Sequence, residues 1–111
     1  MNLTIEHNED ITILKVNEKK ITSENSSTLK AKLLIEAQPN IRALIIDLSK
    51  VENIDSSGFG AFLLADRQLR EHYIPTIIVG LNENVKYLFE ILKLDRVFEI
   101  YNTVEEAIAS L

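Results

Sequence analysis

An unbroken apolar run near the middle of the chain constrains the fold more than any other feature. Residues 43–46 read Ala-Leu-Ile-Ile, with Asp47 at the carboxyl end of the run. An apolar run without polar alternation predicts a strand that is buried on both faces of a sheet. A helical pattern over 59–73 follows, and after Pro75 comes a second apolar run at 76–79. A strand, a helix and a strand of these lengths predict a right-handed parallel crossover.

Shorter patterns on both sides of this unit complete the expected fold. Alternating apolar residues at 3–5 and 11–16 predict two strands, and the short polar turn between them predicts an antiparallel hairpin. Further helices are expected near 25–37, 82–92 and 103–111, with a last strand at 97–101. The candidate helix caps are Ser23 or Asn25, Asn82, and Asn102 or Thr103.

The apolar residues at helical spacing are the expected core of these helices. They are Leu29, Leu33 and Leu34 in the first, Phe62, Ala65, Leu69 and Tyr73 in the second, Val85, Leu88, Phe89 and Leu92 in the third, and Val104, Ala107, Ile108 and Leu111 in the last. The prediction is one α/β domain over residues 1–111. Its mixed sheet is parallel apart from the N-terminal hairpin and is packed with about four helices.

Composition excludes several classes of function. The net charge is −5 and the 12 basic residues are scattered, so no basic stripe is present that could bind the phosphates of a nucleic acid. The chain has no cysteine, which excludes disulfides, thiolate catalysis and cysteine-ligated zinc. It has neither a signal-peptide pattern nor an apolar run of about 18 residues that could span a membrane. We therefore expect a small, acidic, soluble protein of the cytoplasm, without membrane insertion.

The stretch Asp55-Ser56-Ser57-Gly58-Phe59-Gly60, here called the corner, joins the buried central strand to the following helix. Backbone N–H groups at the start of a helix have no partner within the helix. A corner of this kind can hold a phosphate, present a nucleophile or offer a docking surface to another protein.

Catalysis and nucleotide binding have little support in the sequence. A serine nucleophile needs a base within about 3 Å. His72 is fifteen residues beyond Ser57 on the same predicted helix, about 22 Å away, and His7 is expected at the solvated hairpin tip. A dinucleotide-binding loop requires a third glycine at position 63, where this chain has Leu63.

Two further uses of the corner remain. Asp47 and Asp55 could meet at one sheet edge and bind magnesium weakly, although capping of the helix by Asp55 or Ser56 explains the same residues better. A serine at a helix N-terminus could instead be phosphorylated, with Gly58 and Gly60 leaving room for a partner to approach. Four apolar residues exceed what one helical stripe can bury and suggest either a docking patch or a helix pressed between neighbours: Phe59, Ala61, Leu63 and Leu64.

The segment from Leu44 to Gly60, LIIDLSKVENIDSSGFG, resembles the signature of the STAS domain found in anti-sigma factor antagonists. The pattern of the remaining chain agrees with that family. The resemblance implies that Ser57 is phosphorylated by a partner serine kinase that is also the anti-sigma factor, and that a phosphatase restores the unmodified form. It further implies a switch protein that is not an enzyme and needs no cofactor or metal. The implied partner-binding residues are the corner itself, Asp55, Ser56, Ser57, Gly58, Phe59 and Gly60, together with Thr22 and Leu64.

One stretch departs from the family pattern. Where the family commonly carries a glycine and then a Leu-Asp pair, this chain has Lys19-Lys20-Ile21-Thr22. Thr22 thus replaces an aspartate that lies near the phosphorylated serine, and it could itself be a second phosphorylation site. Two alternatives stay open: a STAS subunit of another assembly, such as a stress-signalling or lipid-transport complex, and a nucleotide-binding module that uses Gly58 and Gly60.

Overall fold

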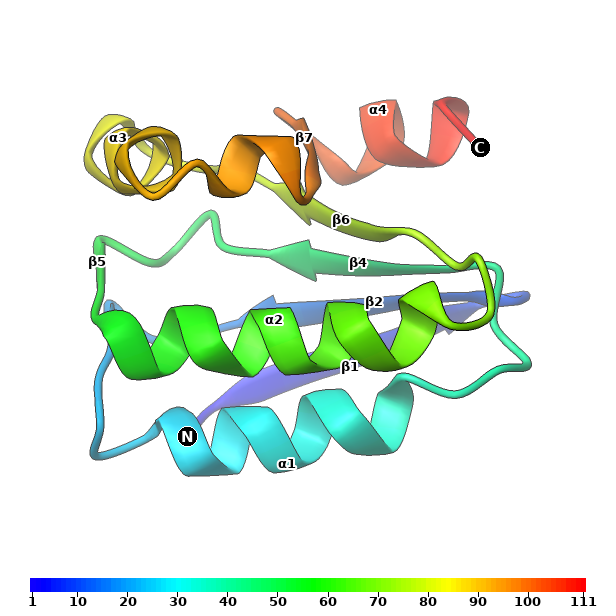
Figure 1. The fold of residues 1–111 in the computed structure, drawn as a ribbon, viewed down its shortest axis with the longest axis horizontal. Coiled ribbons are helices and arrows are strands. Elements are labelled where there is room, and N and C mark those ends of the chain that lie inside the picture. Colours follow the sequence, from blue (N-terminus) through cyan, green and yellow to red (C-terminus); the bar gives the residue numbers. More distant parts are fainter.

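The computed structural model describes residues 1–111 as a sheet with helices on both faces (Figure 1). The elements in chain order are β1 (Leu3–Asn8), β2 (Ile11–Val16), β3 (Lys20–Ile21), α1 (Ser26–Glu36), β4 (Ala43–Asp47), β5 (Asn53–Ile54), α2 (Ser56–Arg70), β6 (Thr76–Val79), α3 (Glu83–Ile91), the 3₁₀ helix η1 (Leu94–Arg96), β7 (Glu99–Tyr101) and α4 (Val104–Ala109). None of the helices combines the length and the apolarity that crossing a membrane requires.

The main sheet has five strands in the order β1-β2-β4-β6-β7. Only β1 and β2 are antiparallel, and the pairs β2–β4, β4–β6 and β6–β7 are all parallel. The predicted mixed α/β fold, with its N-terminal hairpin and central parallel crossover, is confirmed. The apolar run at 43–46 forms β4, which lies in the centre of the sheet and is fully buried over these four residues.

The helices divide the core into two clusters, one on each face of the sheet. The larger cluster, of 22 buried residues, lies under α1, α2 and α3, where α1 and α2 run side by side (Figure 1). The smaller cluster, of seven buried residues, is covered by α4 through Ala107. Both faces of the central strands are therefore buried, which explains why Asp47 and Thr76 are the only polar residues of β4 and β6.

A second, very small sheet joins two loops that are far apart in the sequence. β3 pairs with β5 in parallel, with Lys20 opposite Asn53 and Ile21 opposite Ile54. The sequence did not predict these strands, because two residues are too few to show an alternating pattern. This pairing places the loop before α1 directly beside the first turn of α2.

Several predicted positions are wrong. The second helix begins at Ser56 rather than near Phe59, and it ends at Arg70. Tyr73 is therefore outside the helix, has φ of 58° and is 96% exposed, while Ile74 takes the buried position beyond it. Leu92 is 50% exposed for the same reason, since α3 ends at Ile91 and Leu94 turns into the core. Leu111 follows the end of α4 and is also exposed.

The predicted caps Asn82 and Thr103 are confirmed, and Asn25 acts differently. The side-chain oxygens of Asn82 and Thr103 accept the N–H groups of Val85 and Glu106 at 2.8 and 3.1 Å. Asn25 precedes α1, but its side chain makes no bond to the first turn of the helix. Its amide instead accepts the N–H of Thr22 at 2.9 Å and donates to the carbonyl of Lys20 at 2.9 Å, which shapes the loop before α1.

Candidate functional site

Asp55 is the cap of α2 and the centre of the corner. Its backbone is extended, with φ −93° and ψ 179°, and its Oδ1 accepts the N–H of Ser57 at 2.9 Å. The same oxygen accepts a short hydrogen bond from the hydroxyl of Ser57. The Asp55 carboxylate thus satisfies an unpaired N–H of the first helical turn and also fixes the direction of the serine hydroxyl.

The second carboxylate oxygen of Asp55 holds the loop that precedes α1. Its Oδ2 accepts the N–H of Ser23 at 3.1 Å, and the backbone N–H of Asp55 donates to the carbonyl of Ile21 at 3.0 Å. The hydrogen bond from the Ser57 hydroxyl is the main cause that lowers the pKa of Asp55 below its usual 3.8. Desolvation opposes this effect, and the backbone N–H groups of Ser57, Ser23 and Gly58 lower the pKa further. Asp55 is therefore a carboxylate at neutral pH.

The two serines of the corner have different surroundings. Ser56 is exposed, and its side chain makes no hydrogen bond within the chain. Ser57 is half-buried, and its hydroxyl is held by Asp55. The hydroxyl of Ser57 therefore has one defined orientation, whereas the hydroxyl of Ser56 is free to rotate.

Gly58 has a different role from the one expected. It is buried, and a Cβ at this position would lie 2.7 Å from Cγ2 of Ile21 and 2.7 Å from Cγ2 of Ile54. The residue is a glycine because α2 packs closely against β3 and β5, and it does not clear space for a partner or a nucleotide. Gly60 differs, since a Cβ there would meet nothing within 4 Å.

Phe59 is a core residue and not part of an exposed patch. Its side chain is 5% exposed and forms edge-to-face contacts with Phe62 and Phe89, at ring-centroid distances of 6.4 and 5.3 Å. Ala61 is also buried. The surplus apolar surface of α2 is therefore limited to Leu63 and Leu64, which are 39% and 41% exposed.

A depression of about 410 Å³ lies between α1 and α2 beside the corner. Its lining residues, three from α1 and four from α2, are Ser26, Ser27, Lys30, Ser57, Gly60, Ala61 and Leu64. Lys30 and Ser27 could not be found from sequence patterns, because they are some thirty residues from Ser57 and meet it only through the packing of the two helices. Ser57 and Leu64 are thus brought to one surface, with the open space at Gly60 between them.

Thr22 lies next to this surface but takes no part in the depression. It is half-buried, its hydroxyl accepts the N–H of Glu24 at 3.2 Å, and its own N–H is bound by Asn25. Its neighbour Ser23 connects the loop to Asp55. Thr22 therefore lies in a loop whose position depends on the same carboxylate that orients Ser57.

The remaining groups considered as catalytic or metal-binding do not approach Ser57. The ring of His7 is 2.7 Å from a carboxylate oxygen of Glu36, at the last residue of α1, and His72 is exposed just beyond the end of α2. Asp47 accepts the N–H of Ser49 at 2.9 Å. No group of three or more histidine, aspartate or glutamate side chains is close enough together to hold a metal ion.

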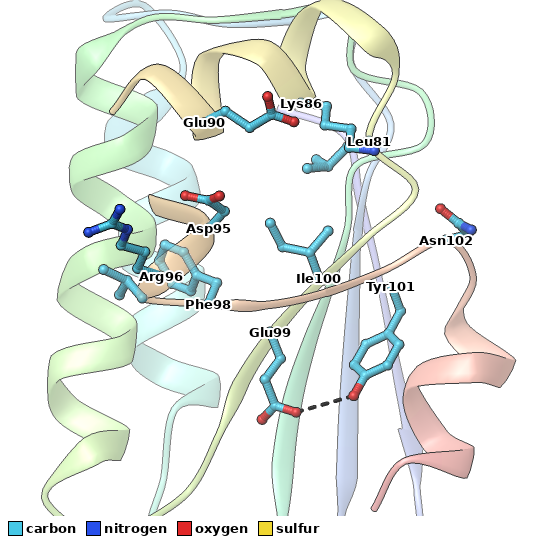
Figure 2. A pocket seen from close by; sticks show the side chains of 11 residues that line it. Leu81, Lys86, Glu90, Asp95, Arg96, Phe98, Glu99, Ile100, Tyr101 and Asn102 are labelled. Atoms are coloured by element: carbon cyan, nitrogen blue, oxygen red, sulfur yellow. Dashed lines mark hydrogen bonds between the residues drawn. The ribbon is translucent and has the colours of Figure 1, made fainter. Parts of the chain in front are cut away.

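A separate hollow of about 620 Å³ lies beneath α3, between η1 and β7 (Figure 2). Figure 2 shows Leu81 and Ile100 pointing into it, with Glu90 above. The hydroxyl of Tyr101 donates a hydrogen bond to Glu99 at 3.3 Å. None of the corner residues contributes to this hollow.

Comparison with known proteins identifies the family of the chain and agrees with its fold. Residues 2–107 match the STAS domain family, and the chain belongs to that family. A protein of Bordetella bronchiseptica named as the anti-sigma factor antagonist BtrV is 29% identical over 90 residues, covering 81% of this chain and 78% of its own.

Two solved proteins have the same fold. The structure of TM1081 of Thermotoga maritima, named as an anti-sigma factor antagonist, has a TM-score of 0.89 at 27% identity and covers 97% of this chain and 92% of its own. SpoIIAA is 20% identical in both of its forms. Its unphosphorylated form has a TM-score of 0.81 and covers 96% of this chain and 93% of its own. Its phosphorylated form, from Bacillus, has a TM-score of 0.75 and covers 98% of each chain.

Proposed function

We propose that this protein is an anti-sigma factor antagonist whose docking to an anti-sigma factor is switched off by phosphorylation of Ser57. The observation that carries the proposal is the hydroxyl of Ser57, which Asp55 holds at the edge of a depression lined by Leu64 and open at Gly60. The names of the relatives supply the class of partner, an anti-sigma factor.

The unmodified surface is suited to docking. Leu64 offers an apolar contact, Gly60 lets a partner's backbone come close to α2, and Ser56 offers an unused hydroxyl for hydrogen bonding. The surface carries a single charged side chain in its depression, Lys30, so little charge has to be desolvated on binding. In this state the protein occupies the anti-sigma factor, and the sigma factor is released.

Phosphorylation reverses this state through charge. The anti-sigma factor is itself the serine kinase and transfers the γ-phosphoryl group of ATP to the Ser57 oxygen. An O–P bond forms, the bond between the γ-phosphorus and the β-phosphate oxygen breaks, ADP leaves, and the hydroxyl proton passes to a base of the kinase or to solvent. The product carries a charge of about −2 at neutral pH. A phosphate at the edge of the docking surface adds a large desolvation penalty and repels acidic groups of the partner. A phosphatase restores the hydroxyl, and the protein is a substrate and switch in this cycle rather than an enzyme.

Release of sigma factor tests the proposal. A candidate anti-sigma factor and its sigma factor, from the same organism as this protein, are purified as a complex and titrated with the protein. The unmodified protein should displace the sigma factor, and protein carrying phosphoserine at position 57 should not. Equal displacement by both forms would contradict the switch at Ser57, and a failure of the unmodified protein with every such complex would contradict the class.

A further inference from the structure

Lys30 is an unpaired cation in the depression that contains Ser57. It lies on α1, is exposed, and makes no ion pair or hydrogen bond. The three ion pairs of the chain join other residues, namely His7 with Glu36, Arg42 with Asp10, and Arg70 with Asp66. Lys30 is the only charged residue that lines the depression, and Asp55 is the only charged residue hydrogen-bonded to Ser57.

A phosphate on Ser57 could not keep the contact that the hydroxyl makes. The esterified oxygen has no proton to donate, so its hydrogen bond to Asp55 is lost. Asp55 is ionised, and its carboxylate repels the phosphate at this short range. We therefore expect the phosphate to turn away from Asp55. Space for it is present at Gly60, where an added Cβ would meet no atom of another element within 4 Å.

We propose that Lys30 binds this phosphate and holds it in the depression between α1 and α2. The inference rests on the proposed phosphorylation of Ser57. An ammonium on a flexible four-carbon stem can follow a phosphate over several ångströms and form a charge-assisted hydrogen bond with it. Lys30 thereby fixes the phosphate over Gly60 and beside Leu64, so that the modification covers the docking surface.

The test measures the ionisation of the phosphate directly and needs neither a kinase nor a partner protein. Phosphoserine is installed at position 57 during translation, and the second ionisation of the phosphate is followed by ³¹P NMR as a function of pH. A nearby cation favours the dianion and lowers the pKa of this ionisation from its usual value of about 6. Lys30→Gln should therefore raise this pKa by about half a unit.

Lys32→Gln is the matched control. Lys32 is exposed on the same helix, does not line the depression, and its replacement removes the same charge. A shift with Lys30→Gln that is at least twice the shift with Lys32→Gln supports the proposal. Equal shifts, or no shift, would overturn it. Because the phosphoserine is installed during translation, this result is independent of whether a kinase modifies Ser57, which the phosphotransfer experiment decides.

Discussion

Gly58 and Gly60 are two residues apart on α2 and have opposite surroundings. A Cβ on Gly58 would collide with Ile21 and Ile54, whereas a Cβ on Gly60 would meet nothing. Glycine inside a helix is less stable than alanine by about 0.5–1 kcal/mol. Internal packing accounts for Gly58, but nothing within the chain accounts for Gly60. Its absent side chain is consistent with close approach of a partner.

The two glycines give a paired prediction on stability. Gly58→Ala should lower the free energy of unfolding by about 1–2 kcal/mol, because the overpacking against two β-branched side chains exceeds the gain in helix propensity. Gly60→Ala should raise it by about 0.5–1 kcal/mol. Urea denaturation of both variants and the wild type measures these changes. A loss of stability in Gly60→Ala would show that a methyl group at position 60 collides with neighbouring atoms.

Gly60→Ala should also separate stability from docking. A methyl group placed at a tightly packed interface costs about 1–3 kcal/mol, so the variant should bind the anti-sigma factor about fivefold more weakly or worse. Isothermal titration calorimetry measures the dissociation constant. Unchanged affinity in this more stable variant would show that Gly60 is not part of the docking surface.

Leu64 should contribute to docking without contributing to folding. Leu64→Asp places a charge on an exposed position, so stability should change by no more than about 0.5 kcal/mol. Binding to the anti-sigma factor should weaken by about tenfold or more, since a leucine at an interface is replaced by a group that must be desolvated. Ile91→Asp is the control, because Ile91 is an exposed apolar residue of α3 and does not line the depression. If both variants bind equally well, the surface is elsewhere.

The pH dependence of stability should report the hydrogen bonds of Asp55. Its pKa is lower in the folded protein than the usual 3.8. The corresponding stabilisation is therefore complete above the unfolded pKa of about 4 and is lost as the pH falls through the lower folded value. Asp55→Asn keeps a capping side chain but cannot titrate.

The comparison of these two proteins isolates Asp55 from the other carboxylates, which are common to both. The difference in free energy of unfolding, wild type minus Asp55→Asn, should be constant above about pH 5 and should fall in value between about pH 4 and pH 2. Chemical denaturation across this range measures the difference. A difference that does not vary with pH would show that Asp55 is not held by Ser57 and Ser23 in solution.

Residue patterns predicted the larger elements but not the contacts between distant loops. The apolar run of β4, the crossover through α2 and the caps Asn82 and Thr103 were all predictable, because periodicity and capping are local properties of the chain. The pairing of β3 with β5 was not, since each strand has two residues. The exposure of Tyr73 could not be predicted either, because the helical spacing continues past Arg70 although the helix does not.

The same limit applies to the candidate site. The sequence indicated the serine, the helix N-terminus and the capping aspartate, which are all within three residues of one another. It gave Gly58 the wrong role because Ile21 and Ile54 reach that glycine only through the small sheet. It left open whether Phe59 belongs to a docking patch or is buried, because an apolar excess on a helix does not show which residues pack against α3.

Phosphotransfer to Ser57 tests the central claim most directly. A candidate anti-sigma kinase from the same organism is incubated with the protein and radiolabelled ATP, and the modified residue is located by mass spectrometry of the digested product. We predict that the wild type and Ser56→Ala are labelled on Ser57 and that Ser57→Ala is not labelled. Labelling of Ser57→Ala at a rate equal to the wild type, or modification at Ser56 or Thr22 in its place, would contradict the account.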